Sequence, residues 1–226
     1  MKGETRNPDG YLAPYGVTAD AVVFTIKDDR LAVLLARRQD APCRGRWALP
    51  GGFIDIERET ARNTIMRKLH EKTGLPPIYV EQLRTYDDIR RDKRGRVLSI
   101  AHLALIPSSL LPNVDGWHTV SELPPLPFDH GRMIADGVFR LRGKLWYSNI
   151  AVGLLPLKFT AREALAVYSV ISGRALGRPD NLVRDLRKAQ LIEPTGEHSE
   201  ASHGGGRRPK LYRFVSRDPA WSYNRR

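Results

Sequence analysis

The sequence predicts two domains: a mixed α/β domain over residues 1–145, and a smaller helical domain with a terminal hairpin over residues 146–226. Three observations support this division. Strand-like apolar runs alternate with two helical patterns in the first 145 residues, which is typical of an α/β fold. The remainder holds two short helical patterns and then two strand-like runs around a Gly- and Arg-rich loop. Positive charge is concentrated in this second part.

The first domain begins with a predicted β-hairpin. Val17–Ile26 and Leu31–Ala36 are apolar runs separated by a short charged turn. Asp20 lies inside the first run, and we interpret it as a polar group at a strand end or edge rather than as a site residue. Later elements are predicted as strands at Ile78–Thr85, Val97–Ile106 and Trp117–Val120, a charged loop at Asp87–Arg96, and a helix at Asp129–Arg142.

The stretch Leu49–Leu75 has the layout of a loop followed by a helix. Gly51 and Gly52 allow the backbone to come close to a ligand. The helix is expected from Glu59 or Thr60 to Thr73, with a buried stripe, and Gly74 followed by Pro76-Pro77 should end it. The stripe consists of Ala61, Ile65 and Leu69.

The second domain is predicted to be a winged helix-turn-helix. Thr160 and Glu163 form a capping box that opens one helix, and Gly173 ends it. Asp180 is the expected N-cap of a second helix, whose buried stripe is Leu182, Leu186 and Ala189. Its exposed cationic face would be Asn181, Arg184, Arg187 and Lys188. A returning hairpin would carry Arg207, Arg208 and Lys210 at its tip.

Charge and composition narrow the class of protein. The net charge is +12, and the last 76 residues hold 14 Lys and Arg against 7 Asp and Glu, a net of +7. A basic small domain suggests a polyanion such as double-stranded DNA as partner, although a basic face can also serve solubility alone. The single cysteine, Cys43, and the lack of a long apolar run lead us to expect a cytoplasmic protein without a membrane partner.

Positions 68, 71 and 72 share one face of the first helix. An enzyme that cleaves a diphosphate would carry carboxylates there to hold Mg²⁺. The residues are Lys68, Glu71 and Lys72, so we expect no metal site, no catalytic residues and no cofactor. The two lysines could instead meet a diphosphate directly; the alternative is that they point to water.

This stretch resembles the Nudix box of Nudix hydrolases. Glu59, Arg67, Leu69, Glu71, Gly74 and Leu75 stand at the spacing of the box. Lys68 and Lys72 replace two of its glutamates, and the gap from Gly52 to Glu59 is one residue longer than in the family. With the winged-helix pattern and the segment Leu123–Pro156, the chain resembles the Nudix-related transcriptional regulator (NrtR) family. The resemblance implies a Nudix α/β/α sandwich with a C-terminal winged helix-turn-helix domain.

The family resemblance also implies a function. It points to a homodimeric repressor of NAD-metabolism genes that senses ADP-ribose or a related nucleotide diphosphate and binds a palindromic operator. The expected ligand-binding residues are Arg37, Arg38, Arg46, Gly51, Gly52, Phe53, Lys68, Glu71, Lys72 and Tyr86. Two alternatives remain open: an active Nudix pyrophosphatase with an appended basic domain, and a nucleotide-binding module that does not touch DNA.

Overall fold

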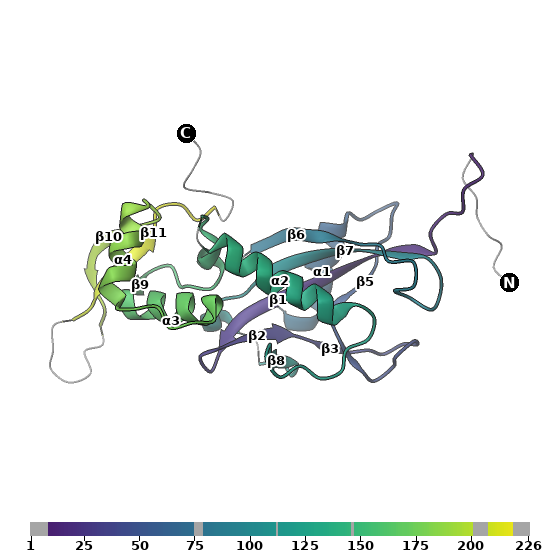
Figure 1. The fold of residues 1–226 in the computed structure, drawn as a ribbon, viewed down its shortest axis with the longest axis horizontal. Coiled ribbons are helices and arrows are strands. Elements are labelled where there is room, and N and C mark those ends of the chain that lie inside the picture. Colours follow the sequence, from purple (N-terminus) through teal and green to yellow (C-terminus); the bar gives the residue numbers. More distant parts are fainter. Residues whose placement is uncertain (1–8, 75–78, 112, 146, 201–207, 219–226) are drawn as a thin grey trace.

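The computed structural model describes residues 9–74, 79–111, 113–145, 147–200 and 208–218. A larger part built on a central sheet and a smaller part with two helices and a short sheet lie along the longest axis of the molecule (Figure 1). None of the described helices combines the length and the apolarity needed to cross a bilayer.

The elements in chain order are β1 Gly16–Lys27, β2 Arg30–Leu34, β3 Ala36–Arg37, β4 Trp47–Ala48, β5 Gly51–Phe53, α1 Ala61–Thr73, β6 Tyr79–Tyr86, β7 Val97–Leu105, η1 Ser108–Leu110, β8 Trp117–Thr119, α2 His130–Lys144, η2 Ile150–Gly153, β9 Phe159–Thr160, α3 Ala161–Ser172, α4 Pro179–Lys188, β10 Ile192–His198 and β11 Lys210–Phe214.

The central sheet has the strand order β6-β7-β1-β2-β8, and β5 pairs with β1 beside this path. Strands β1 and β7 run parallel, whereas the other pairs are antiparallel. Asp28 and Asp29 make the β1–β2 turn, both with positive φ, which matches the tight hairpin turn expected between these strands. The hairpin and strand predictions for this domain are confirmed, although β2 ends at Leu34.

The sheet is covered by one helix on each face. Alternate residues of β1 point to opposite sides, so Ala19, Ala21 and Val23 pack with Ile65 and Leu69 of α1. Val22 and Phe24 face the other cluster, which includes Met133, Ile134 and Leu141 of α2. This arrangement is the expected α/β/α sandwich.

Helix α1 has the predicted stop and start signals. The Thr60 hydroxyl caps its first turn by accepting from the Asn63 amide, and Gly74 ends it in the left-handed conformation. Ile65 and Leu69 are fully buried, while Ala61 is half-buried. Residues 75–78 lie outside the described residues, so the expected role of Pro76-Pro77 is not described.

The smaller part is a helix-turn-helix followed by a wing. Helix α3 opens with the predicted Thr160–Glu163 capping box and closes at Gly173. The start of helix α4 corrects one expectation: its N-cap is Arg178, and Asp180 lies inside the first turn. Pro179 provides the reason, because the fixed φ of proline suits the first helical position and moves the start upstream. The wing sheet has the order β10-β11-β9.

The buried stripe of α4 is also shifted from the predicted one. Val183 and Leu186 are its buried residues, whereas Leu182 and Ala189 are only partly buried. The helix packs against α3 and β10, and this tertiary contact selects a face one residue away from the predicted stripe.

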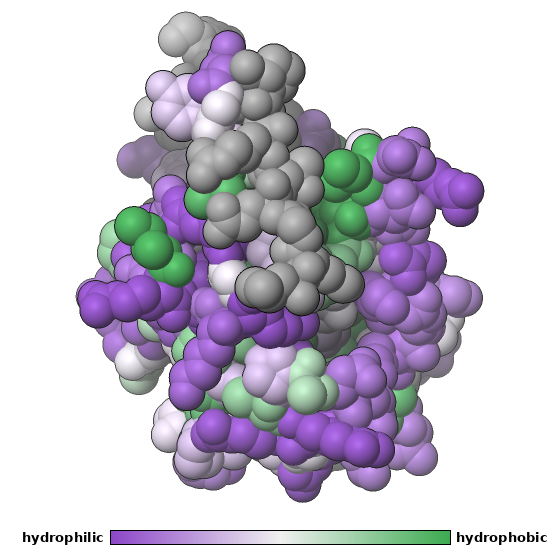
Figure 2. All heavy atoms as spheres, turned by 90° about the vertical axis from the view of Figure 1, so that its right-hand side faces the viewer, coloured by the Kyte–Doolittle hydropathy of each residue, from purple (hydrophilic) through white to green (hydrophobic). Residues whose placement is uncertain are grey.

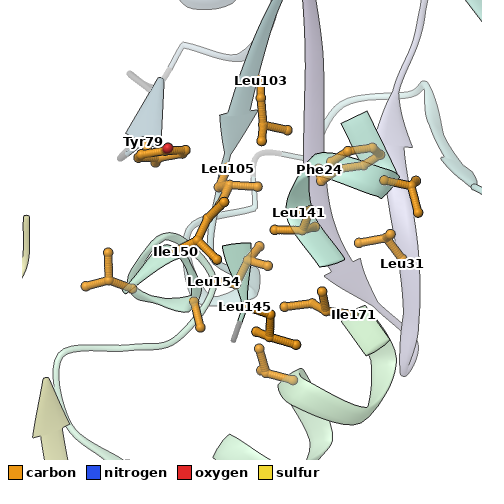
Figure 3. Packing of buried hydrophobic residues seen from close by; sticks show 14 of the residues in the cluster. Phe24, Leu31, Tyr79, Leu103, Leu105, Leu141, Leu145, Ile150, Leu154 and Ile171 are labelled. Carbon is orange, nitrogen blue, oxygen red and sulfur yellow. The ribbon is translucent and has the colours of Figure 1, made fainter. Parts of the chain in front are cut away.

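One hydrophobic core continues from the central sheet into the smaller part. Leu105 and Tyr79 of the sheet, Leu141 and Leu145 of α2 and its end, Ile150 and Leu154 near η2, and Ile171 of α3 gather in the same cluster (Figure 3). Residues 150–155 are all buried. The two parts are therefore joined by packed side chains as well as by the chain itself.

Candidate ligand pocket and nucleic-acid interface

A cavity of about 360 Å³ opens where β5, α1, the segment around Arg38, the Asp87–Arg96 loop and the start of α2 meet. Its walls come from segments far apart in the sequence, which the sheet and α2 bring to one end of the larger part (Figure 1). The described lining residues are Thr18, Asp20, Arg38, Asp40, Ala41, Leu49, Gly51, Gly52, Phe53, Arg67, Lys68, Arg91, Asp92, Arg94, Phe128 and His130.

Gly51 and Gly52 form a close-packed edge of this cavity. A Cβ at Gly51 would collide with the Ala19 carbonyl oxygen and the Asp20 carboxylate, and a Cβ at Gly52 would lie 3.3 Å from Cε of Lys68. Only glycine at position 51 allows β5 to pair with β1 at Asp20. The two glycines thus bring backbone, rather than side chains, to the cavity surface.

Asp20 corrects the interpretation drawn from its strand. It is buried within β1 and lines the cavity. The Ser99 hydroxyl donates to its Oδ2 over 2.5 Å, and the Thr18 hydroxyl donates to the same oxygen over 3.2 Å. Its other oxygen lies 3.9 Å from Nε2 of His130. The carboxylate is held as a fixed acceptor at the base of the cavity.

Five cationic side chains line the cavity, and their partners differ. Arg67 is paired with Glu59 and Glu71, Arg94 with Asp92, and Arg91 with Asp129. The fourth, Lys68, has its Nζ 3.0 Å from Oε2 of Glu71.

Arg38 is different from the other four. Its Nε donates to the Pro42 carbonyl oxygen over 2.8 Å, and its guanidinium lies 5.1 Å from the centre of the Phe128 ring. No carboxylate of the described chain lies within ion-pairing distance of it. Arg38 is therefore the lining cation that can meet an anionic ligand without first breaking an ion pair.

Phe53 offers an apolar surface at the rim of the cavity. Its side chain is 41% exposed, with the Tyr15 ring edge-on at 6.0 Å and the Arg94 guanidinium 5.0 Å from its ring centre. An exposed aromatic ring beside arginines suits the stacking of a planar base.

His130 joins the cavity to the first turn of α2. Its Nδ1 accepts a hydrogen bond from the Leu49 amide over 3.0 Å, so this nitrogen carries no proton. Burial lowers the pKa of His130, and the ring is accordingly neutral near pH 7. The neighbouring Asp129 carboxylate receives two hydrogen bonds from Arg91, at 2.8 and 3.1 Å.

The face of α1 that corresponds to the Nudix box is an ion-pair network. Arg67 donates to both oxygens of Glu59, over 2.6 and 2.8 Å. Hydrogen bonds from Arg67 and then from Thr64 lower the pKa of Glu59 to about 2. Lys68 and then Arg67 lower the pKa of Glu71. The carboxylate oxygens on this face are thus engaged by cations of the protein itself.

Half of the predicted ligand-binding residues line the cavity, and half do not. Arg38, Gly51, Gly52, Phe53 and Lys68 are brought together. Among the described lining residues, Arg37, Arg46, Glu71, Lys72 and Tyr86 are missing.

Each exclusion has a local reason. The Arg37 guanidinium stacks 4.2 Å above Trp47, and Arg46 turns toward the Pro125 carbonyl oxygen. Tyr86 is buried, and its hydroxyl donates to Asp136 over 2.8 Å. Glu71 is bound by Arg67 and Lys68 at the cavity's edge, and Lys72 is exposed one position further along α1. Of the two lysines expected to meet a ligand, only Lys68 is placed to do so.

Sequence reasoning missed the residues that come from distant segments, among them Arg91, Arg94, Phe128 and His130. Asp87–Arg96 was predicted only as a charged loop, and within it the Arg91 side chain is 4% exposed. The alternation of acidic and basic residues in that loop was the one feature of the sequence that could have indicated its place at the cavity.

The smaller part presents a cationic surface on α4 and the wing. Asn181, Arg184, Arg187 and Lys188 are all exposed, as predicted. Within this group, Arg184 donates to the Asn181 side chain and to Asp185, over 3.3 and 3.2 Å. Arg208 and Lys210 are exposed at the start of β11, whereas Arg207 lies outside the described residues. A groove of about 750 Å³ runs between α4 and the wing, lined by Arg184, Arg187 and Tyr212 among others.

Comparison with known proteins identifies both parts. Residues 14–137 match the NUDIX domain family, and residues 151–214 match the NrtR DNA-binding winged helix domain family. A relative from Acinetobacter baylyi named "ADPR responsive transcriptional repressor NtrR" is 30% identical over 219 residues, which cover 92% of this chain and 86% of the relative.

Solved structures agree with these matches. Shewanella oneidensis NrtR complexed with a 27mer DNA is 34% identical, with a TM-score of 0.78, and the match covers 90% of this chain and 95% of that one. The NUDIX domain of the same NrtR, complexed with ADP ribose, is 37% identical, with a TM-score of 0.52 over 60% of this chain and 93% of that one. The chain therefore belongs to the NrtR family, in which a NUDIX domain is joined to a DNA-binding winged helix domain.

Proposed function

We propose that this chain is a transcriptional repressor that binds operator DNA through α4 and the wing. It responds to ADP-ribose bound in the cavity of its Nudix domain. The observation that carries the proposal is the presence, in one chain, of a cation-lined Nudix cavity and an exposed cationic recognition helix, joined by α2. The names of the relatives supply the two ligands, since one responds to ADPR and another is complexed with DNA.

The DNA-binding part of the proposal rests on charge and shape. Arg184, Arg187 and Lys188 are exposed along one side of α4, the second helix of the helix-turn-helix. In such motifs the second helix enters the major groove, and Arg and Asn side chains read base edges. Arg208 and Lys210 would contact phosphates from the wing.

The effector part rests on the cavity. Its volume falls within the range of small-molecule sites. Arg38, Lys68 and the backbone at Gly51–Gly52 would hold the diphosphate, Phe53 would stack on the adenine, and Asp20 would accept from a ribose hydroxyl. Arg91, Arg94, Phe128 and His130 extend the predicted set of ligand-binding residues.

We propose further that the chain does not hydrolyse its ligand. A Mg²⁺-dependent hydrolase needs free carboxylate oxygens as metal ligands. Here Glu59 and Glu71 are hydrogen-bonded to Arg67, Lys68 or both, and Lys68 and Lys72 stand where the Nudix box has glutamates. These donors do not fit a magnesium site, so binding without turnover is the expected outcome.

The remaining features of the proposal follow from DNA recognition by the family. We propose a homodimer, a palindromic operator of about 20 base pairs with half-sites one helical turn apart, regulated genes of NAD metabolism, and a cytoplasmic location with the DNA. The effector would release DNA by favouring a dimer geometry with the wrong half-site spacing. We place the domain boundary at residues 145/146.

One experiment tests the central proposal. A mobility-shift titration on an operator from the neighbourhood of the chain's own gene is carried out with and without ADP-ribose, beside a hydrolysis assay with Mg²⁺. We expect salt-sensitive DNA binding that ADP-ribose weakens, and no turnover. Hydrolysis at an ordinary enzymatic rate would favour the pyrophosphatase alternative, and ligand binding without DNA binding would favour the simple binding module.

The two lysines of α1 can be tested separately because the structure places them differently. Lys68→Glu should weaken metal-free ADP-ribose binding about tenfold or more, since it puts a carboxylate at the cavity wall. Lys72→Glu makes the same charge change outside the cavity and is the matched control. Equal effects of the two substitutions would show that Lys68 acts only through the overall charge.

A further inference from the structure

A second cavity of about 450 Å³ adjoins the effector cavity. The two share Arg91 and Phe128 in their linings, so the side chains of these residues form the wall between them. The second cavity lies between the Asp87–Arg96 loop, the segment around Cys43 and Arg46, and the first turn of α2. Nothing in the proposed recognition of ADP-ribose uses it.

Its lining carries an excess of unpaired positive charge. Arg46, Arg90, Lys93 and Arg132 line it, and in the described chain none of them has a carboxylate within ion-pairing distance. Of the two lining carboxylates, Asp129 receives both side-chain hydrogen bonds of Arg91, whereas Asp88 accepts from the Arg90 amide over 2.8 Å and has no cationic partner in the described chain. On its described walls the cavity therefore has four cations without a carboxylate partner against one carboxylate without a cationic partner.

Such an arrangement of exposed cations favours the binding of an anion. Like charges that face a common hollow repel one another, and a concave wall concentrates the field that attracts an anion. These cations also come from three separate segments, so their convergence is a property of the fold rather than of a single charged run.

Location argues that this anion is a small molecule rather than DNA. The cavity lies at the start of α2, at the opposite end of that helix from α3 and the DNA-binding part (Figure 1). The described surface visible on that end of the molecule is mainly hydrophilic, with apolar side chains between the polar ones (Figure 2).

We propose that this second cavity is a phosphate-binding site, with Arg46, Arg90, Lys93 and Arg132 as its cationic ligands. The phosphate is either free in solution or an additional phosphate group on a nucleotide whose body occupies the effector cavity beyond Arg91. The assignment of the cavity is independent of the effector's identity, whereas the second source rests on the proposed binding of ADP-ribose.

The site is tested by calorimetric titration of the full chain with inorganic pyrophosphate at low ionic strength, in the presence and absence of saturating ADP-ribose. The cavity variant is Lys93→Gln with Arg132→Gln, which removes two exposed cations from two different segments. The matched control is Lys27→Gln with Arg58→Gln, two exposed cations outside both cavities. A further variant, Arg38→Gln, reports on the effector cavity alone.

With ADP-ribose saturating the effector cavity, we expect pyrophosphate affinity to fall at least tenfold in the cavity variant and to stay within about twofold in the control. Arg38→Gln should weaken only the pyrophosphate that ADP-ribose displaces. Complete displacement of pyrophosphate by ADP-ribose, an equal loss in the control, or no binding by the wild-type chain would overturn the proposal. A loss of operator affinity in the cavity variant would assign these cations to DNA and would overturn it too. If ADP-ribose itself does not bind, the pyrophosphate titration still decides the question.

A second titration identifies the source of the phosphate. ADP-ribose is compared with ADP-ribose that carries one more phosphate on the adenosine ribose. Tighter binding of the phosphorylated compound, lost in Lys93→Gln with Arg132→Gln, would place the phosphate on the effector. If the two compounds bind equally and pyrophosphate also binds, the site takes free phosphate rather than a phosphate group of the effector. Both results support the site.

Discussion

The Nε of Arg142, in the last turn of α2, donates a hydrogen bond to the carbonyl oxygen of Ile171 in α3 over 3.0 Å. The contact is close enough that a Cβ at Gly173, which ends α3, would lie 2.8 Å from a terminal nitrogen of Arg142. The other end of α2 carries His130, which lines the effector cavity. One helix thus contacts both the ligand pocket and the helix-turn-helix.

Arg142→Met should reduce the communication between these two sites. The substitution keeps the apolar stem but removes the donor to Ile171, so a change at the pocket would be passed less fully to α3. We expect ADP-ribose affinity within about twofold of wild type, and at least a threefold reduction in the factor by which ADP-ribose weakens operator binding. Mobility shifts at several ADP-ribose concentrations measure this factor. Lys27→Met, which removes an exposed cation far along β1, is the control; an unchanged factor in Arg142→Met would contradict the role of the contact.

Arg38 and Arg37 make a natural pair for testing the pocket. Arg38→Gln removes the lining cation without a carboxylate partner and should raise the dissociation constant for ADP-ribose by about 10- to 100-fold, the value of a charge-assisted hydrogen bond. Arg37→Gln makes the same change in the adjacent residue, whose guanidinium stacks on Trp47 outside the cavity. Calorimetry should find little effect there. Similar losses in both would indicate a general electrostatic effect.

The wing should contribute to DNA affinity without contributing to sequence preference. With about five phosphate contacts per protomer, log affinity should fall with log salt at a slope near −4 to −5 per protomer. Arg208→Gln with Lys210→Gln should make this slope shallower by about 2 and weaken all sequences equally. Arg213→Gln is the control on the same strand, because Arg213 is already paired with Glu193 at 2.7 Å. A sequence-dependent loss in the double variant would instead mean that the wing reads bases.

His130 should make the fold sensitive to mild acid. Burial lowers its pKa in the folded protein, so below its ordinary value of about 6.5 the unfolded chain binds more protons than the folded one. The contribution of neutral His130 to stability is present above pH 6.5 and is lost as the pH falls toward the lowered pKa. In His130→Asn the side-chain oxygen can still accept from the Leu49 amide. The free energy of unfolding of this variant, measured with urea, should fall less steeply below pH 6.5 than that of the wild type, by a slope equivalent to at most one proton. Identical slopes would rule out His130 as the cause.

Tyr168 offers a test of the core of the smaller part. Its side chain is fully buried, burial raises the pKa of its hydroxyl, and within the described chain that hydroxyl has no hydrogen-bond partner. Tyr168→Phe should therefore raise the free energy of unfolding by about 1 kcal/mol. Tyr86→Phe provides the opposite case, because its hydroxyl donates to Asp136, and it should lower the same quantity by about 1 kcal/mol. Destabilisation by both would point to an unseen partner of Tyr168.

The fold was largely predictable because its signals are local. The Thr160–Glu163 capping box, Gly173 and Gly74 set helix boundaries through hydrogen bonds within a few residues, and each acts as predicted. The start of α4 was misplaced at Asp180 because two local signals competed there, and the proline at position 179 prevailed.

The candidate site was only half predictable, since its walls depend on tertiary structure. Gly51, Gly52 and Lys68 stand close together along the chain and were found from the spacing of the box. Arg91 and His130 reach the cavity only because β7 runs parallel beside β1 and α2 crosses the sheet. Tyr86 shows the converse, because a strand residue that pattern alone left open to a ligand is buried, with its hydroxyl on Asp136 of α2.

The length of α2 gives the molecule a mechanical property that neither domain has alone. Fifteen residues at a rise of about 1.5 Å make a rod of about 22 Å. If its pocket end acted as the pivot, a tilt of about 5° would carry the Arg142 end through about 2 Å on that length. In a two-fold dimer each protomer would add its own displacement, so the separation of the two recognition helices could change by about 4 Å against a half-site spacing of about 34 Å. A rearrangement too small to alter the fold of either domain would then be enough to put both helices out of phase with the DNA.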